Sequence, residues 1–211
     1  MKTIALLIFI LMSVINIVAC NKKIKILIIL SKITLAPLAF LFAILNSQFE
    51  NKIDMLILLS FSFYLIGDIL LLSEKTKLFL SGLISFLFGH ISFIILFLQF
   101  KQSSTIFPIF LILLIYPEIY MFKITQNGKT LKIPMRIYSI LMAIFISFSA
   151  TTLNPFFVLA TAIFTLSDSF IARNVCSEKQ KFSDTYVMGT YTLALILLSI
   201  GLIYLSSINL G

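Results

Sequence analysis

Two aspartates lie inside long apolar runs of this 211-residue chain, Asp68 in LIGDILL and Asp168 in TLSDSFI. An ionisable side chain inside a membrane span is costly, so it points to a functional site by default. Two carboxyl groups in a low-dielectric site cannot both ionise cheaply, and one of them tends to keep its proton. If the two side chains meet, the sequence therefore predicts a general acid beside a carboxylate.

Three kinds of chemistry use such a pair. Aspartyl proteolysis activates a water molecule between the carboxyls, and cleavage of an acetal-like ether protonates the substrate and stabilises an oxocarbenium ion. Proton-coupled transport carries the proton across the membrane. A structural interpretation stands beside these three, because either aspartate could pair with Lys32 to hold helices together or reach water one turn away.

The residues around the aspartates fit two of these chemistries poorly. Intramembrane aspartyl proteases carry Gly-x-Gly-Asp, whereas this chain has Leu65 in the place of the first glycine, and Asp168 follows a serine. Transporters commonly place their sites at broken helices near the midplane of the membrane. Both aspartates are expected close to one membrane surface, which disfavours a transport site.

The composition indicates an integral membrane protein. Hydrophobic residues make up 60% of the chain and charged residues only 11%, and the mean hydropathy is +1.12. Apolar runs of about 20 residues recur along the whole chain, which is the length that an α-helix needs to cross a bilayer. We expect an all-α fold with the lipid bilayer as its surroundings.

Neither the net charge nor the cysteines indicate another kind of partner. The formal net charge is +8, but the basic residues fall in short clusters between the apolar runs, where they set topology and meet lipid headgroups. We therefore expect no nucleic-acid partner. Cys20 and Cys176 have neither metal-ligand spacing nor an obvious pairing, so we expect free thiols that are structurally neutral.

Eight apolar runs have the length of a membrane span. They predict one membrane domain over residues 1–211 with spans at about 4–20, 24–45, 54–72, 78–99, 105–122, 133–150, 155–172 and 186–208.

Basic residues predict the direction of the spans. Lys2, Lys52 and Lys101 lie at the N-terminus and in the connections after the even-numbered spans, and Lys32 lies inside the second span. The other twelve follow the odd-numbered spans: Lys22, Lys23, Lys25, Lys75, Lys77, Lys123, Lys129, Lys132, Arg136, Arg173, Lys179 and Lys181. This asymmetry places both termini on the non-cytoplasmic side.

The N-terminal run allows a second interpretation, because residues 1–20 resemble a lipoprotein signal that ends in Val18-Ala19-Cys20. Cleavage there would put the lysines that follow Cys20 outside the membrane and invert every later basic cluster. The charge distribution argues against that arrangement.

The two aspartates are expected at the same depth. Each lies about four residues before the cytoplasmic end of its span, roughly 6 Å below the interface. Other polar residues enter this layer or lie next to it: Lys32, Tyr64, His90, Tyr138 and Tyr191. They predict a polar cavity near the cytoplasmic leaflet.

Each of these residues also has a simpler interpretation. Tyr138 and Tyr191 could be interfacial belt residues, which are common at membrane surfaces. His90 could make a helix-packing hydrogen bond, and Lys32 could contact a lipid headgroup. Glu118, near the end of the fifth span, is expected to be solvated.

Five stretches in this order resemble the YhhN-like lysoplasmalogenase family: LLSFSFYLIGDILLL, FLSGLISFLFGHISFI, IPMRIYSILM, FTLSDSFIA and YVMGTYTLALIL. Gly67-Asp68 followed by Gly89-His90, and Ser167-Asp168 followed by Met188-x-x-Tyr191, are its most specific parts. The chain departs from the family pattern at Ile33, where a proline is usual, and at Thr192 and Leu195, which follow the motif tyrosine.

The resemblance implies a membrane enzyme of eight spans that hydrolyses the vinyl ether bond of lysoplasmalogens to a fatty aldehyde and a glycerophospho-base, without a metal or other cofactor. It implies Asp68 and Asp168 as the catalytic pair. The expected substrate-binding residues are Lys32, Tyr64, His90, Tyr138 and Tyr191. The alternative is a lipid-binding or transport protein without enzymatic activity, and the abundance of Ile, Lys, Phe and Asn favours a bacterial cytoplasmic membrane.

Overall fold

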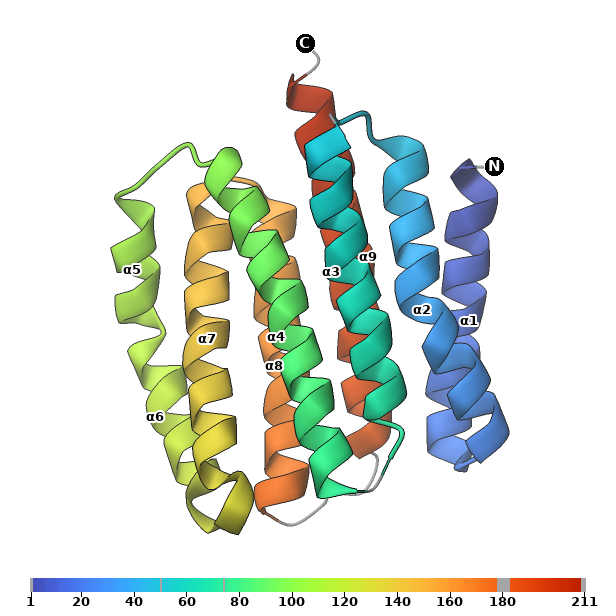
Figure 1. Ribbon diagram of the computed structural model, residues 1–211, viewed down its shortest axis with the longest axis vertical. Helices are drawn as coiled ribbons and strands as arrows, with labels where there is room; N and C mark the ends of the chain where they lie inside the picture. Colours follow the sequence, from blue (N-terminus) through green and yellow to red (C-terminus); the bar gives the residue numbers. More distant parts are fainter. Residues whose placement is uncertain (1, 50, 74, 178–182, 210–211) are drawn as a thin grey trace.

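The computed structural model describes residues 2–49, 51–73, 75–177 and 183–209. These residues form nine α-helices and two short 3-10 helices and contain no strand, which confirms the expected all-α fold (Figure 1). The helices are α1 Lys2–Lys22, α2 Lys25–Asn46, α3 Asn51–Leu70, α4 Thr76–Gln99, α5 Ile106–Leu113, α6 Ile115–Ile124, η1 Thr125–Asn127, η2 Lys129–Leu131, α7 Lys132–Thr151, α8 Pro155–Cys176 and α9 Ser183–Asn209.

Eight helical segments are long and apolar enough to cross a membrane, as the sequence predicts. Apart from the fifth, each of these segments contains one α-helix whose ends lie within a few residues of the expected ones. The seventh span, α8, continues to Cys176, four residues beyond its expected end. The chain is therefore a multi-pass integral membrane protein.

The fifth span is broken, although we expected one helix over 105–122. α5 ends at Leu113 and α6 begins at Ile115. Pro117 accounts for the break, because it has no N–H to donate to the carbonyl of Leu113 and its ring crowds that turn. The two helices and η1 together still have the length of one span.

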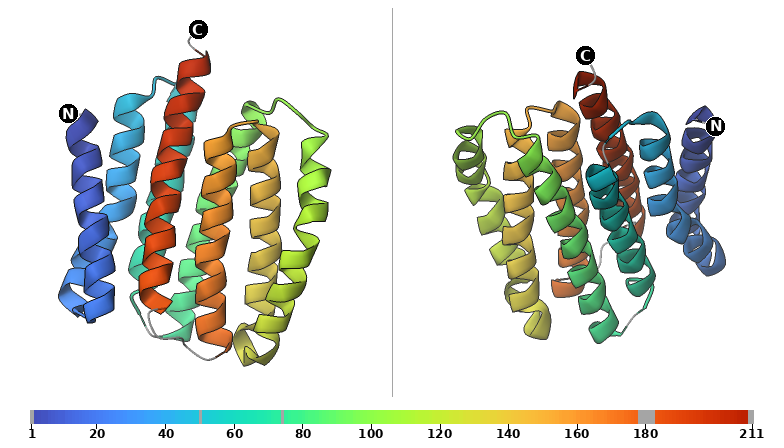
Figure 2. Two further views of the ribbon diagram at one scale, coloured as in Figure 1. Left: turned by 180° about the vertical axis from the view of Figure 1, so that it is seen from behind. Right: turned by 45° about the horizontal axis from the view of Figure 1, so that its top comes forward.

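Six helices form a closed ring. The neighbouring pairs around it are α2–α3, α3–α4, α4–α7, α7–α8, α8–α9 and α9–α2. α1 packs outside the ring against α2 and α9, and α5 and α6 pack outside it against α7. Figures 1 and 2 show these outer helices at opposite edges of the bundle. Additional helices therefore cover the ring at these two edges, α1 at one and α5 with α6 at the other.

The connections that carry most of the basic residues meet at one end of the bundle, which we call the basic end. The C-terminal ends of α1, α3, α6 and α8, from which these connections leave, lie at this end, and the start of α1 and the end of α9 lie at the opposite end (Figure 1). Lys179 and Lys181, which belong to the same group of charges, lie outside the described residues. That the basic end faces the cytoplasm stays a prediction from the charge asymmetry.

Two glycines allow α3 and α4 to approach closely. A Cβ atom on Gly67 would lie 2.6 Å from the ring of Phe86, and one on Gly89 would lie 2.5 Å from the ring of Tyr64. The rings occupy the space that these glycines leave. The glycine in each of the pairs Gly67-Asp68 and Gly89-His90 therefore sets the position of an aromatic ring beside the polar residues.

Candidate functional site

The seven residues predicted for the site come from all six ring helices. α2 carries Lys32, α3 carries Tyr64 and Asp68, α4 carries His90, α7 carries Tyr138, α8 carries Asp168 and α9 carries Tyr191. All are buried except Lys32, whose side chain is 12% exposed. Their hydrogen bonds and ion pair divide them into two groups, one around each aspartate.

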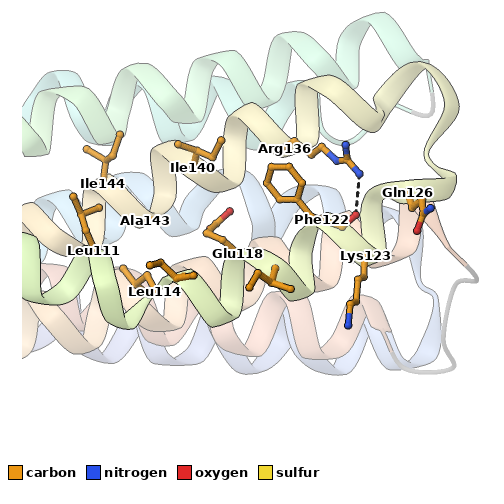
Figure 3. Close-up of a pocket in the computed structure, with 12 residues that line it drawn as sticks. Leu111, Leu114, Glu118, Phe122, Lys123, Gln126, Arg136, Ile140, Ala143 and Ile144 are labelled. Atoms are coloured by element: carbon orange, nitrogen blue, oxygen red, sulfur yellow. Dashed lines mark hydrogen bonds between the residues drawn. The ribbon is translucent and has the colours of Figure 1, made fainter.

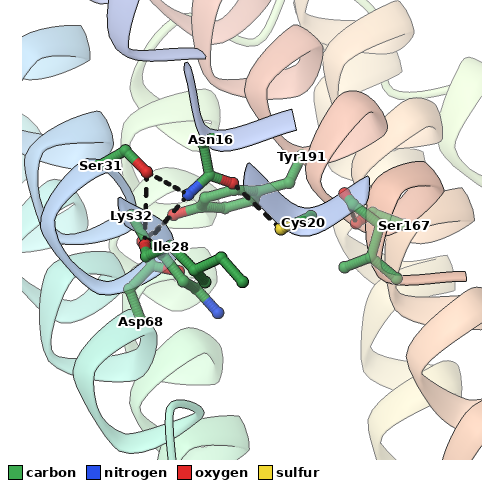
Figure 4. A network of polar contacts seen from close by, with 9 residues as sticks. Asn16, Cys20, Ile28, Ser31, Lys32, Asp68, Ser167 and Tyr191 are labelled. Atoms are coloured by element: carbon green, nitrogen blue, oxygen red, sulfur yellow. Dashed lines mark hydrogen bonds and ion pairs between the residues drawn. The ribbon is translucent and has the colours of Figure 1, made fainter. Parts of the chain in front are cut away.

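Asp68 is held by a cation and a hydroxyl group. The ammonium of Lys32 lies 3.7 Å from Oδ1 of Asp68. The hydroxyl of Tyr191 donates a hydrogen bond of 2.5 Å to the other oxygen, Oδ2 (Figure 4). Three helices therefore converge on one carboxyl group, and Lys32 supplies a compensating charge for its ionised form.

Asp168 ends a chain of hydrogen bonds. Tyr138 donates to its Oδ2 over 2.8 Å, and the Tyr138 hydroxyl lies 3.4 Å from Nε2 of His90. Nδ1 of His90 lies 2.9 Å from the hydroxyl of Tyr64.

The donors in this chain follow from the number of protons. The single hydroxyl proton of Tyr138 goes to Asp168, so Tyr138 must accept from Nε2–H of His90. A neutral His90 then accepts at Nδ1 from Tyr64. Every donor points toward Asp168, and the chain fixes the orientation of the Tyr138 hydroxyl that binds the carboxyl group.

Both aspartates line one small cavity. Its volume is about 20 Å³, enough for about one water molecule. Lys32 and Tyr191 also line it, and Ser167, Leu71, Ile171, Val187 and Met188 complete the wall together with two phenylalanines, Phe86 and Phe164. The structure therefore brings the two carboxyl groups to a common space that is mostly enclosed by apolar side chains.

Phe86 and Phe164 lie between the two groups of polar residues. The ring of Phe164 lies 5.5 Å from that of Tyr191 and 4.8 Å from that of His90, so it touches both groups. Phe86 lies 6.1 Å from Tyr191 and 5.7 Å from Tyr64. We did not predict either phenylalanine, because a chain with 22 of them gives no signal for one particular ring.

The simpler interpretations of the site residues have different outcomes. Tyr138 and Tyr191 are 3% and 4% exposed, so they are not interfacial belt residues. Lys32 pairs with Asp68, as a counter-ion does. His90 does link helices through Tyr64 and Tyr138, as a packing histidine would.

The two aspartates are not equally far from the ends of their helices. Asp68 lies two residues before the end of α3, whereas α8 continues for eight residues after Asp168. They nevertheless line the same cavity. At the basic end α8 extends farther than α3 (Figure 1). The expected distance of four residues from each span end was therefore inexact, although both aspartates do line one cavity.

A further polar group flanks Lys32 from α1. The amide of Asn16 donates to Oγ of Ser31 over 2.7 Å and to the carbonyl of Ile28 over 3.2 Å (Figure 4). Asn16 and Ser31 are fully buried. These bonds tie α1 to the segment of α2 that carries Lys32. We did not predict Asn16, although a polar amide inside the first apolar run could have indicated a buried hydrogen-bonding residue.

Glu118 is not simply solvated, contrary to our expectation. It is half-buried, and its Oε2 accepts a hydrogen bond of 2.8 Å from Ser139. It lies on α6, outside the ring, and takes no part in the cavity between the aspartates. Over the described residues, no cluster of three or more His, Cys, Asp or Glu side chains could hold a metal ion.

Comparison with known proteins gives one match. The model of the YhhN family matches residues 27–202, which include all seven site residues and most of the chain. No curated protein and no solved structure matches the chain.

Proposed function

The chain belongs to the YhhN family, and we propose that it is a membrane hydrolase that cleaves the vinyl ether bond of lysoplasmalogens. The products would be a fatty aldehyde and a glycerophospho-base. One observation carries the proposal: Asp68 and Asp168 line the same buried cavity, which has room for about one water molecule. An acid, a carboxylate and a water are the groups that vinyl ether hydrolysis requires.

The partners of the two carboxyl groups support different roles for them. Lys32 compensates the charge of a carboxylate at Asp68, so we assign Asp68 as the carboxylate. We assign Asp168 as the acid, with Tyr138 bound to Oδ2 and the proton on Oδ1. Tyr64, His90 and Tyr138 position this acid.

The reaction begins with transfer of the Asp168 proton to the vinyl carbon that bears the alkyl chain. This leaves an oxocarbenium ion at the carbon bonded to the ether oxygen. The carboxylate of Asp68 stabilises this cation electrostatically. The faces of Phe86 and Phe164, which line the cavity, add a smaller cation–π contribution.

Water then attacks the cationic carbon and forms a C–O bond, and Asp68 accepts the proton that the water loses. The product is a hemiacetal. Its hydroxyl proton returns to Asp168, the bond to the glycerol oxygen breaks, and that oxygen takes the proton held by Asp68. One water is consumed, and both aspartates regain their initial states.

Substrate binding requires movement, because a cavity of about 20 Å³ has no room for an alkyl chain. The hydrogen bond of 3.0 Å from Ser167 to the carbonyl of Val187 joins α8 to α9 at the wall of this cavity. We propose that the lipid enters as these two helices separate at the basic end.

The direct test is release of aldehyde by the purified protein in detergent. A lysoplasmalogen is compared with a 1-acyl lysophospholipid that has the same headgroup and chain length. We expect aldehyde from the vinyl ether lipid and no cleavage of the ester. Binding of lysoplasmalogen without aldehyde release would contradict the proposal and favour a lipid-binding or transport protein.

A further inference from the structure

A second, larger cavity lies outside the ring, between α5 and α6 on one side and α7 on the other (Figure 3). Its volume is about 620 Å³, in the range of small-molecule sites, which is about 300–1,000 Å³. Ile119 and Ile140 line it and are 50% and 45% exposed on the outer surface of the bundle. We call it the lateral groove, because these exposed rims open it sideways toward the bilayer.

The lateral groove has an apolar half and a polar half. Leu111, Leu114 and Ile144 line the part away from the basic end (Figure 3). Arg136 and Lys123 line the part toward the basic end. From Leu111 to Lys123 the helical rise amounts to about 18 Å, which suits a ligand with a charged head and one extended apolar chain.

Arg136 is held in place for an anion. Its Nη2 donates to the carbonyl of Phe122 over 3.0 Å, its Nε donates to Oγ1 of Thr125 over 3.2 Å, and its guanidinium lies 4.6 Å from the centre of the Phe122 ring. A guanidinium has five N–H donors, so these two bonds fix its plane without exhausting its donors. Planar arginine binds phosphate groups well.

Glu118 lies between the two halves. Its Oε2 accepts from Ser139, the residue after Tyr138, so α7 presents Tyr138 to Asp168 and Ser139 to Glu118. An ionised carboxylate has acceptor sites for more than one donor. Just below a bound phosphate, it would accept a hydrogen bond from a hydroxyl group on the ligand.

We propose that the lateral groove binds a lysophospholipid taken from the surrounding leaflet. Arg136 and Lys123 bind its phosphate, Glu118 accepts a hydrogen bond from its free glycerol hydroxyl, and the single chain lies along Leu111, Leu114 and Ile144. A phospholipid with two chains carries an ester in place of this hydroxyl and cannot donate to Glu118. The site lies across α7 from the aspartates and does not depend on hydrolysis.

The chain contains no tryptophan, so a single introduced tryptophan reports on the groove. The test places Ile140→Trp protein in phosphatidylcholine nanodiscs and adds a 1-acyl lysophospholipid with a brominated chain, which quenches nearby tryptophan fluorescence. Ile137→Trp is the matched control, because Ile137 is 54% exposed on the same helix but does not line the groove. Ile119→Trp on α6 is a second reporter if Ile140→Trp fails to fold.

We expect saturable quenching at position 140 that exceeds quenching at position 137. Unlabelled lysophospholipid should reverse it, and a diacyl phospholipid should not. Arg136→Gln should weaken binding about tenfold, the effect of one charge-assisted hydrogen bond, whereas Lys129→Gln, an exposed lysine outside the groove, should not.

Glu118→Gln gives the sharpest comparison. It should weaken binding of the lysophospholipid several-fold, and it should leave binding of an analogue with a methylated hydroxyl unchanged. Equal quenching at positions 140 and 137, equal competition by diacyl lipid, or no response to either charge-removing variant would each overturn the proposal. The probe has no vinyl ether, so the outcome is independent of the proposed hydrolysis.

Discussion

The hydroxyl of Tyr191 donates a hydrogen bond of 2.5 Å to Asp68, although 123 positions separate the two residues in the chain. Asp168 accepts a bond of 2.8 Å from another tyrosine, Tyr138. Each aspartate therefore has one tyrosine donor on another helix of the ring, but only Asp68 has a lysine at ion-pair distance among the described residues. This difference in partners is the structural basis for giving the two carboxyl groups different roles.

Removal of the hydroxyl from Tyr138 should reduce aldehyde release more than its removal from Tyr64. Tyr138→Phe deletes the bond to Asp168, which becomes a carboxylate as its proton passes to the substrate. A hydrogen bond to a charged group is worth about 1.5–3 kcal/mol, or roughly 10–100-fold in rate. Tyr64 acts only through His90, so Tyr64→Phe should cost less. Tyr204→Phe, which changes a half-exposed tyrosine outside the site, is the control for the loss of a hydroxyl.

Lys32→Met should destabilise the protein, because it leaves Asp68 buried without its counter-ion. Loss of one partner of a buried ion pair costs about 3–5 kcal/mol. The double variant Lys32→Met with Asp68→Asn should recover most of the thermal stability, since it removes the uncompensated charge. It should remain inactive in aldehyde release. Recovery of both stability and activity would show that the pair only holds helices together.

Gly89→Ala should lower the thermal stability, whereas Gly189→Ala should not. An added Cβ on Gly89 would lie 2.5 Å from the ring of Tyr64, and overpacking of this kind costs about 1–3 kcal/mol. Gly189 lies in α9 with nothing within 4 Å of an added Cβ. Alanine there should be neutral or stabilising by up to about 1 kcal/mol, because glycine is a poor helix former. Equal melting temperatures for the two variants would contradict the packing role of Gly89.

Reaction in D₂O should place one deuterium on carbon 2 of the released aldehyde. The proposed first step transfers a solvent-exchanged proton from Asp168 to the vinyl carbon that bears the alkyl chain. That carbon becomes carbon 2 of the aldehyde. Mass spectrometry of the aldehyde, trapped at once to prevent enolisation, measures the label. An aldehyde without deuterium would mean that the bond breaks without protonation of carbon, and the assigned role of Asp168 would be wrong.

The span pattern of the fold could be predicted because the cost of unpaired backbone groups in lipid imposes long apolar helices. Eight such runs correspond to eight helical segments in the structure. The break at Leu114 was missed, although Pro117 and its missing N–H were visible in the sequence. The order of helices around the ring could not be predicted, because the contact of α4 with α7 depends on packing between distant segments.

The predicted site residues do come together, because few polar residues enter the apolar spans and buried polar groups need partners. The sequence could not show which residues contact which aspartate. Lys32 and Tyr191 bind Asp68, whereas Tyr138 binds Asp168 and is linked through His90 to Tyr64. Phe86 and Phe164 could not be singled out. The place of Phe86 follows from the close approach of α3 and α4 at Gly67, and that of Phe164 from its contacts with Tyr64 and Phe86 across the ring. Glu118 was assigned to solvent because its bond to Ser139 depends on the packing of α6 against α7.

The most direct test of the account is aldehyde release from lysoplasmalogen by Asp68→Asn and Asp168→Asn, with Asp54→Asn as the matched control. Asp54 is also on α3, but it does not line the cavity. We expect each site variant to lose at least about 100-fold in rate, the contribution of a positioned acid or base, while it elutes as a folded protein. The control should keep the activity of the unchanged protein. Activity retained in either Asp68→Asn or Asp168→Asn would contradict the claim that the two aspartates work as a catalytic pair.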